Sequence, residues 1–217
     1  PTKKGKGPNA DDATQLTVYE GLDGNALWHP EGKTLYFISD REGNRRLFLV
    51  DVQTGETKRM TSFDEELYGV AFTPDKRSLS FWRAGAQGGL YTIPLAGGEP
   101  RKVLDRPGNN TVFGDLDYSW SPDMRYIAFV QRLDRSGYYP WESGANIWIL
   151  DTTTGKRNDV TGVNATNTTP RFSPDGRYLF FRSNRDGDAL WILPLKLEDA
   201  GSTELEIKYE KPTGPVK

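Results

Sequence analysis

The segment Trp120-Ser121-Pro122-Asp123-Met124-Arg125-Tyr126-Ile127-Ala128-Phe129 contains the pattern that decides the fold. An aromatic residue stands two positions before a proline, and a Leu or Ile and then a Phe stand five and seven positions after it. This pattern occurs four times, with successive prolines 44, 48 and 52 residues apart: Trp28/Pro30/Leu35/Phe37, Phe72/Pro74/Leu79/Phe81, Trp120/Pro122/Ile127/Phe129 and Phe172/Pro174/Leu179/Phe181. A recurrence at this interval indicates a chain built from structural repeats.

Each copy predicts two strands joined by a tight turn. The proline has no N–H to donate, so it ends the first strand, and the Asp and Gly that follow it favour a turn. The Leu or Ile and the Phe are two residues apart, so both lie on one face of the second strand. Polar, Gly-containing segments at 40–44 and 184–188 then predict hairpin turns into a third strand.

Two further strands complete the repeat. Third strands are predicted at the apolar runs 47–50, 90–95, 147–150 and 190–195, and turns at Gly55, Gly98 and Gly155 lead to short fourth strands. A sheet of four short strands can hide its apolar faces only against neighbouring sheets, which is the construction of a propeller blade. The sequence therefore predicts an all-β fold, a β-propeller of four four-stranded blades.

The repeats also predict how the chain is divided. We expect a flexible leader or linker at 1–13, blades over 14–209 and a linker at 210–217, with repeats near 25–61, 69–104, 117–161 and 169–209. Thr17, Thr61 and Thr161 each precede the next repeat's proline by 13 residues, so residues 14–19 are expected to be a blade-closing strand. Either this strand pairs with the last blade to close a small ring, or the chain is a segment of a larger propeller. The rival fourth strand of the last repeat is 204–209.

Composition excludes several classes of function. Lys and Arg number 28 against 30 for Asp and Glu, so the basic excess typical of nucleic-acid binding is absent. No apolar run is long enough to insert into a membrane, and there is no cysteine for disulfides or thiolate metal sites. The bacterial cytoplasm and the periplasm both remain open as the compartment.

No residues in the sequence form a catalytic or metal-binding pattern. The single histidine, His29, stands where the other repeats carry Thr73, Ser121 and Ser173, so we interpret it as a turn residue and not as part of a triad. Asn184, Asp186 and Asp188 superficially resemble a calcium loop but lack its later Glu, which favours a hairpin turn. We therefore predict no catalytic residue, no metal and no cofactor within this chain.

The third repeat departs from the pattern through two insertions. Its loop at 131–146 and the connection entering it at 105–117 are both long, and both emerge on the same rim of a four-stranded blade. Aromatic and Arg side chains commonly anchor interfaces, so we expect these insertions to contact a peptide or protein, or another domain of the same protein. The alternative is that the rings pack on a neighbouring blade. The predicted contact residues are Arg132, Arg135, Tyr138, Tyr139, Trp141, Asn110 and Phe113.

The runs Trp120–Asp123, Phe172–Leu179 and Ile38–Gly43 resemble the WD40-like blades of TolB, of tricorn-type peptidases and of prolyl oligopeptidase relatives. The resemblance covers residues 14 to about 195, and the charged, proline-containing tail is most similar to that of a bacterial tricorn-type serine peptidase. It implies a non-catalytic propeller segment that controls peptide access or protein contacts for a serine active site elsewhere. That family's catalytic Ser and His match no position here. The alternatives are a TolB-like envelope interaction module without an enzyme, and the propeller of a prolyl oligopeptidase-family peptidase.

Overall fold

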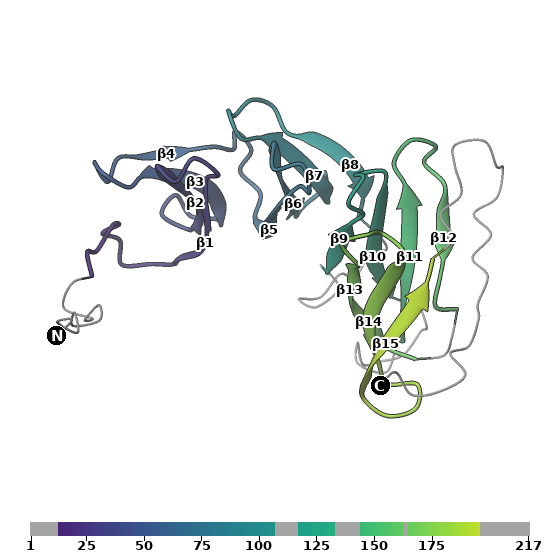
Figure 1. Ribbon diagram of the computed structural model, residues 1–217. Coiled ribbons are helices and arrows are strands. Elements are labelled where there is room, and N and C mark those ends of the chain that lie inside the picture. Colours follow the sequence, from purple (N-terminus) through teal and green to yellow (C-terminus); the bar gives the residue numbers. More distant parts are fainter. Residues whose placement is uncertain (1–12, 107–116, 133–143, 163–164, 196–217) are drawn as a thin grey trace, which may run out of the picture. The chain divides into compact units, whose positions relative to one another are not determined.

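The computed structural model describes residues 13–106, 117–132, 144–162 and 165–195. These residues form strands and no helix, and the strands make three four-stranded sheets and one three-stranded sheet, all antiparallel (Figure 1). In every sheet the strands are adjacent in chain order, as in a propeller blade. The predicted all-β propeller architecture is thus confirmed. The predicted leader and linker, and the predicted strand at 204–209, lie outside the described residues except for residue 13.

The strands begin and end close to the predicted positions. The first sheet contains β1 (Asp23–Trp28), β2 (Thr34–Ser39), β3 (Arg46–Asp51) and β4 (Thr57–Arg59). The second contains β5 (Leu67–Phe72), β6 (Ser78–Arg83), β7 (Gly89–Pro94) and β8 (Arg101–Asp105). The third contains β9 (Tyr118–Trp120), β10 (Tyr126–Arg132), β11 (Ala145–Asp151) and β12 (Arg157–Asp159). The fourth contains β13 (Asn167–Phe172), β14 (Tyr178–Ser183) and β15 (Ala189–Pro194).

The chain divides into two compact units, Pro1–Glu66 and Leu67–Lys217. Unit 1 holds the first sheet, and unit 2 holds the other three, so the division falls between the first and second repeats. In unit 1, residues 14–19 are assigned to no strand, although we expected a blade-closing strand there. Leu16 nevertheless packs against the apolar cluster of Phe37, Phe48 and Val50.

The turn after each first strand is built by the same hydrogen bonds in unit 2. The hydroxyl oxygen of Ser121 accepts the Tyr126 N–H at 2.8 Å and donates to Asp123, and Thr73 and Ser173 form the equivalent bonds. In unit 1 His29 stands at this position and makes a different bond, in which its Nδ1 accepts the N–H of Glu31, two residues later, at 3.1 Å. His29 therefore lies in a turn, as its alignment with the other repeats predicted.

An arginine after the second strand stabilises two of the sheets. In unit 1, the Arg41 guanidinium lies 5.1 Å from the centroids of both Phe37 and Phe48, and it bonds Asp23 on the first strand. In unit 2, Arg185 lies over Phe181 and Trp191 and donates to Asn167 at 3.0 Å. Each arginine therefore ties three strands of its sheet together through stacking and hydrogen bonds.

Neighbouring sheets of unit 2 pack face to face, and the same face of each sheet meets the sheet that follows it in the chain. The second sheet presents Trp82 and Leu90 to Ile127 and Phe129 of the third sheet. The third sheet in turn presents its opposite face, with Ala128 and Ile147, to Leu179 and Phe181 of the fourth. In the third and fourth sheets, the Leu or Ile and the Phe of the repeat are therefore the side chains that cover the preceding sheet.

Candidate functional site

A hollow of about 410 Å³ lies within unit 2 beside the first strands of its three sheets. A first strand is the edge of its sheet, and in a propeller that edge lines the central channel. The volume is in the range of sites that hold small ligands or short segments of peptide. The lining residues are Gly69, Val70, Ala71, Phe72, Pro74, Asp117, Tyr118, Ser119, Trp120 and Arg171.

The walls of the hollow are mostly apolar, and the repeat pattern explains why. Phe72 and Trp120 occupy the aromatic position two residues before the proline in the second and third repeats. That position ends the first strand; Phe72 is half-buried there, whereas Trp120 is buried in the apolar cluster between the second and third sheets and presents only an edge to the hollow. Val70 and Ala71 continue the apolar surface along β5. Such a surface favours apolar side chains of a ligand over ions.

Tyr118 fixes the position of β9 relative to the second sheet. Its hydroxyl lies 2.8 Å from the Ser80 hydroxyl, 2.9 Å from the Ser80 carbonyl and 3.0 Å from the Gly69 carbonyl. Trp120 Nε1 also donates to the Ser80 hydroxyl oxygen, at 3.2 Å. Burial raises the pKa of Tyr118, so its hydroxyl remains a hydrogen-bond donor at ordinary pH.

A second inter-sheet bond holds the fourth sheet against the third. The Phe172 N–H donates to the Ser119 hydroxyl oxygen at 3.1 Å, which satisfies a backbone group at the edge of β13. Together with the Tyr118 bonds, it links the three first strands around the hollow. The site is therefore shaped by hydrogen bonds between sheets and not by one loop.

Arg171 supplies the positive charge of the site. Its guanidinium is 58% exposed, donates to the Pro170 carbonyl at 2.7 Å, and lies 3.9 Å from the Asp117 carboxylate. An ion pair at that distance and exposure is weak, so both groups remain accessible to a charged ligand. Asp117 is also where the described chain resumes after the long connection entering the third repeat.

The first strands on both sides of the hollow are interrupted by bulges. The register of β5 shifts between Tyr68 and Ala71, and Gly69 between them has a φ of 60°. In β13 the equivalent residue, Thr169, has a φ of 52°, which is costly for a β-branched side chain. Bulges of this kind alter the direction of a strand and often lie beside binding sites. Nothing in the repeat pattern predicted them.

Most of the contact residues predicted from the sequence lie outside the described residues. These are Arg135, Tyr138, Tyr139, Trp141, Asn110 and Phe113. Arg132 is described, at the end of β10, where it is half-buried and pairs in register with Ala145. Tyr118 and Arg132 lie at the same end of the third sheet, because β9 and β10 are antiparallel. The described flanks of both insertions therefore share one rim, as predicted.

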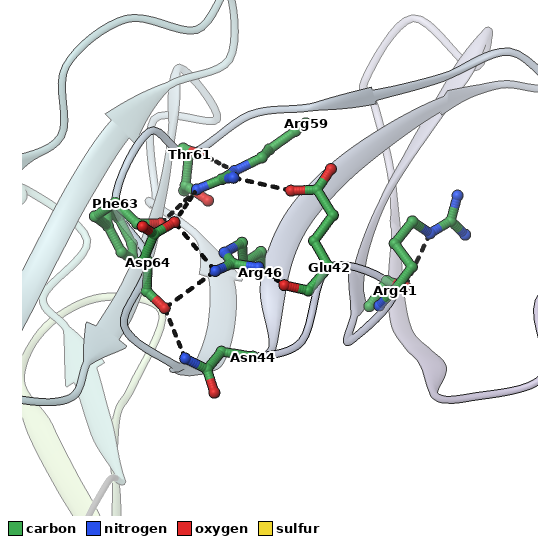
Figure 2. A network of polar contacts seen from close by, with 9 residues as sticks. Arg41, Glu42, Asn44, Arg46, Arg59, Thr61, Phe63 and Asp64 are labelled. Atoms are coloured by element: carbon green, nitrogen blue, oxygen red, sulfur yellow. Dashed lines mark hydrogen bonds and ion pairs between the residues drawn. The ribbon is translucent and has the colours of Figure 1, made fainter.

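Unit 1 contains a network of polar contacts around Arg46, Arg59 and Asp64. Figure 2 shows Arg46 and Arg59 directed at Asp64, with distances of 3.1 and 3.2 Å to its carboxylate. The same guanidinium groups donate to the backbone carbonyls of Glu42, Thr61 and Phe63 (Figure 2). Both arginines thus satisfy the chain's own carbonyls, and the network stabilises the segment that follows β4.

Neither a metal cluster nor a membrane-spanning helix occurs in the described segments. There, no group of three or more His, Cys, Asp or Glu side chains is arranged to hold a metal ion. The hairpin residues considered as a calcium loop have other contacts, since Asn184 accepts the Thr166 N–H and Asp188 pairs with Arg182. None of the described residues forms a helix suited to crossing a bilayer.

Comparison with known proteins supports the same fold. No family model matches the chain. An uncharacterized peptidase, YuxL of Bacillus subtilis, is 29% identical over 72% of this chain and 21% of its own length. A TolB homolog of Chlorobium chlorochromatii is also 29% identical, over 71% of this chain and 32% of its own. The chain thus spans about a fifth to a third of the length of these relatives.

Two solved structures give the same result. TolB from Acinetobacter baumannii matches 82% of this chain and 42% of its own, with 26% identity and a TM-score of 0.55. The tricorn protease matches 82% of this chain and 19% of its own, with 17% identity and a TM-score of 0.57. The chain carries WD40-like, TolB-like propeller repeats, as the sequence motifs indicated.

Proposed function

We propose that this chain is a non-catalytic propeller segment of a serine peptidase, and that the hollow beside β5, β9 and β13 binds extended peptide. The hollow carries the proposal because it combines apolar walls with one accessible Arg at the edges of three sheets. Two relatives are named as peptidases, and one of them, YuxL of Bacillus subtilis, is 29% identical to this chain. These matches favour a peptidase as the parent protein. Tricorn-type and prolyl oligopeptidase-type parents are both compatible with this proposal.

The chemistry of the hollow suits a peptide better than a small polar metabolite. Phe72, with Val70 and Ala71 of β5, offers a surface for apolar side chains, while edge strands direct backbone groups away from their own sheets. The Arg171 guanidinium is a strong donor to a carboxylate, such as the C-terminus of a peptide. We therefore expect short apolar peptides with a free C-terminal carboxylate to bind better than their amidated forms.

Titration with a fluorescein-labelled Ala-Val-Phe-Ala peptide, carrying either a free or an amidated C-terminus, tests this proposal by fluorescence anisotropy. We expect Arg171→Ala to weaken binding of the free-acid peptide about tenfold, because a hydrogen-bonded charge pair is lost. The amidated peptide should be affected much less. Arg177→Ala is the matched control, since Arg177 is 75% exposed and does not line the hollow. Equal loss in both variants, or no binding of either peptide, would contradict the proposal.

A second candidate is a TolB-like interaction module, favoured by the match to a TolB homolog at 29% identity. The two candidates differ in the other domains of the protein that contains this segment. A peptidase requires a further domain with a catalytic Ser and His, recognisable in a prolyl oligopeptidase relative by a Gly-x-Ser-x-Gly motif. Sequencing the complete gene decides between them, because a TolB-like protein carries no such domain.

A further inference from the structure

A second hollow, of about 300 Å³, lies between the second and third sheets of unit 2, at the rim where the first strand of each sheet turns into its second. We call it the turn-side pocket. It shares only Trp120 with the hollow beside β5, β9 and β13. Its volume is at the lower end of the range for small-ligand sites. The residues that decide its chemistry are Ser78, Thr92, Glu99, Arg101, Trp120 and Met124.

The turn-side pocket exists because the second sheet carries small polar side chains where the third sheet carries large apolar ones. Ser78 and Tyr126 both stand four residues after the proline of their repeats. Thr92 and Ile149 are equivalent in the register of the second and third strands. Tyr126 and Ile149 are 2% and 0% exposed, and they help to fill the contact between the third and fourth sheets. The contact between the second and third sheets is left open at the same point.

Four polar side chains of the pocket are free to meet a ligand. Within the described residues, the half-buried hydroxyls of Ser78 and Thr92 make no hydrogen bond. Glu99 and Arg101 are exposed, and neither forms an ion pair with another described residue. Arg101 begins β8 opposite Thr92, and Glu99 lies two residues before it in the turn from β7. The pocket therefore offers one anionic, one cationic and two hydroxyl groups.

The wall supplied by the third sheet is apolar. Met124 and Trp120 line the pocket and belong to the apolar cluster between the second and third sheets. Met124 has a φ of 62°, at a position where two other repeats carry Gly32 and Gly176. A long side chain is strained in this backbone conformation, and such strain is often found at functional sites. The flexible thioether can adapt to the shape of an apolar ligand group.

We propose that the turn-side pocket binds a free α-amino acid with an apolar side chain. Glu99 would accept hydrogen bonds from the ligand's ammonium group, and Arg101 would donate to its carboxylate. The ligand's side chain would pack on Met124 and Trp120. A simple anion is disfavoured by Glu99 and a simple cation by Arg101, so a ligand that carries both charges fits the pair best. This inference does not depend on peptide binding in the hollow beside β5, β9 and β13.

Isothermal titration calorimetry of the whole chain with L-leucine tests the proposal. Leucinamide lacks the carboxylate and N-acetyl-leucine lacks the ammonium group, so each should bind at least about tenfold more weakly than leucine. Arg101→Ala should weaken leucine binding about tenfold and abolish the preference over leucinamide. Arg77→Ala is the matched control, because Arg77 is exposed next to Ser78 but does not line the pocket. Arg171→Ala, in the other hollow, should also leave leucine binding unchanged.

A filling variant provides an independent test. Thr92→Ile gives the second sheet the residue that the third sheet has at this position, so it should occupy the pocket. We expect leucine binding to weaken at least about tenfold while the thermal midpoint is retained or raised. A marked fall in the midpoint would mean that the space is not free. That result would overturn the proposal, as would no binding of leucine, equal binding of its two blocked forms, or displacement of leucine by glucose, which would indicate a sugar site.

Discussion

Replacement of Tyr118 by Phe tests whether the wall of the hollow is held by hydrogen bonds between sheets. The substitution removes one oxygen and keeps the ring, including its edge contact with Trp82, whose centroid lies 6.0 Å away. The lost hydroxyl lies within 3.0 Å of two carbonyls and one side-chain hydroxyl on the second sheet. Any loss of stability therefore reports on these polar contacts.

The size of the effect follows from which partners water can reach. Gly69 is exposed, so its carbonyl regains a hydrogen bond from solvent, whereas Ser80 is 0% exposed and is left with weaker partners. Leaving a buried polar group without its partner costs about 1–3 kcal/mol, and the remaining bond from Trp120 favours the lower part of that range. We expect Tyr118→Phe to reduce the free energy of unfolding by about 1–2 kcal/mol.

Urea denaturation followed by intrinsic fluorescence measures this change. If the free energy of unfolding falls by about 2 kcal/mol per molar urea, the urea concentration at the midpoint should fall by roughly 0.5–1 M. Tyr178→Phe is the control, because Tyr178 lies on the exposed face of β14 and should shift the midpoint very little. The reasoning is refuted if Tyr118→Phe leaves the midpoint unchanged, or if both variants shift it equally.

Three further predictions concern the repeat itself. Gly32→Ala should cost about 1 kcal/mol because Gly32 has a φ of 71°, whereas Gly24→Ala, with equally open space but no positive φ, should be neutral or slightly stabilising in thermal unfolding. Arg185→Lys should lower stability by about 1–2 kcal/mol through lost stacking and hydrogen bonds, whereas Arg182→Lys at an exposed ion pair should change it by under about 0.5 kcal/mol. Burial alone would raise the pKa of Asp151, but hydrogen bonds from Arg125 and from two backbone amides lower it. The ionised carboxylate therefore stabilises the fold at pH values above the unfolded pKa of about 3.9. That contribution should be lost as the pH falls below about 3.9, and Asp151→Asn should flatten the acid limb of a plot of stability against pH.

The repeat pattern predicted most of the fold because its apolar spacing is a direct physical constraint. Ile127 and Phe129 must share a face of their strand, and a small sheet must cover that face with its neighbour, as the third sheet does. The turn residues were equally informative, since the Ser121 hydroxyl and the Asp123 carboxylate can satisfy backbone and side-chain groups locally. These features depend on short-range sequence: the apolar spacing appears in all four repeats, and the turn hydroxyl and carboxylate appear in the second, third and fourth.

The candidate site was less predictable because it depends on contacts between repeats. No local signal indicates that Tyr118 reaches Ser80, which is 38 residues earlier, or that Thr169 adopts a positive φ in a bulge. Arg41 and Arg185 were interpreted as turn residues, and their stacking on rings of the second and third strands could be recognised only in three dimensions. A repeated Ser-x-Arg after the second strand is the signal that could have identified them.

Photo-crosslinking tests the proposed function most directly, because it shows where a bound peptide lies. The free-acid Ala-Val-Phe-Ala peptide with a benzophenone group in place of the Phe ring would be irradiated with the protein, and the adducts mapped by mass spectrometry. The account predicts adducts within 69–74 and 117–120, and their loss on competition with the unmodified peptide. Adducts confined to unit 1 or to the outer strands β8 and β12 would contradict it.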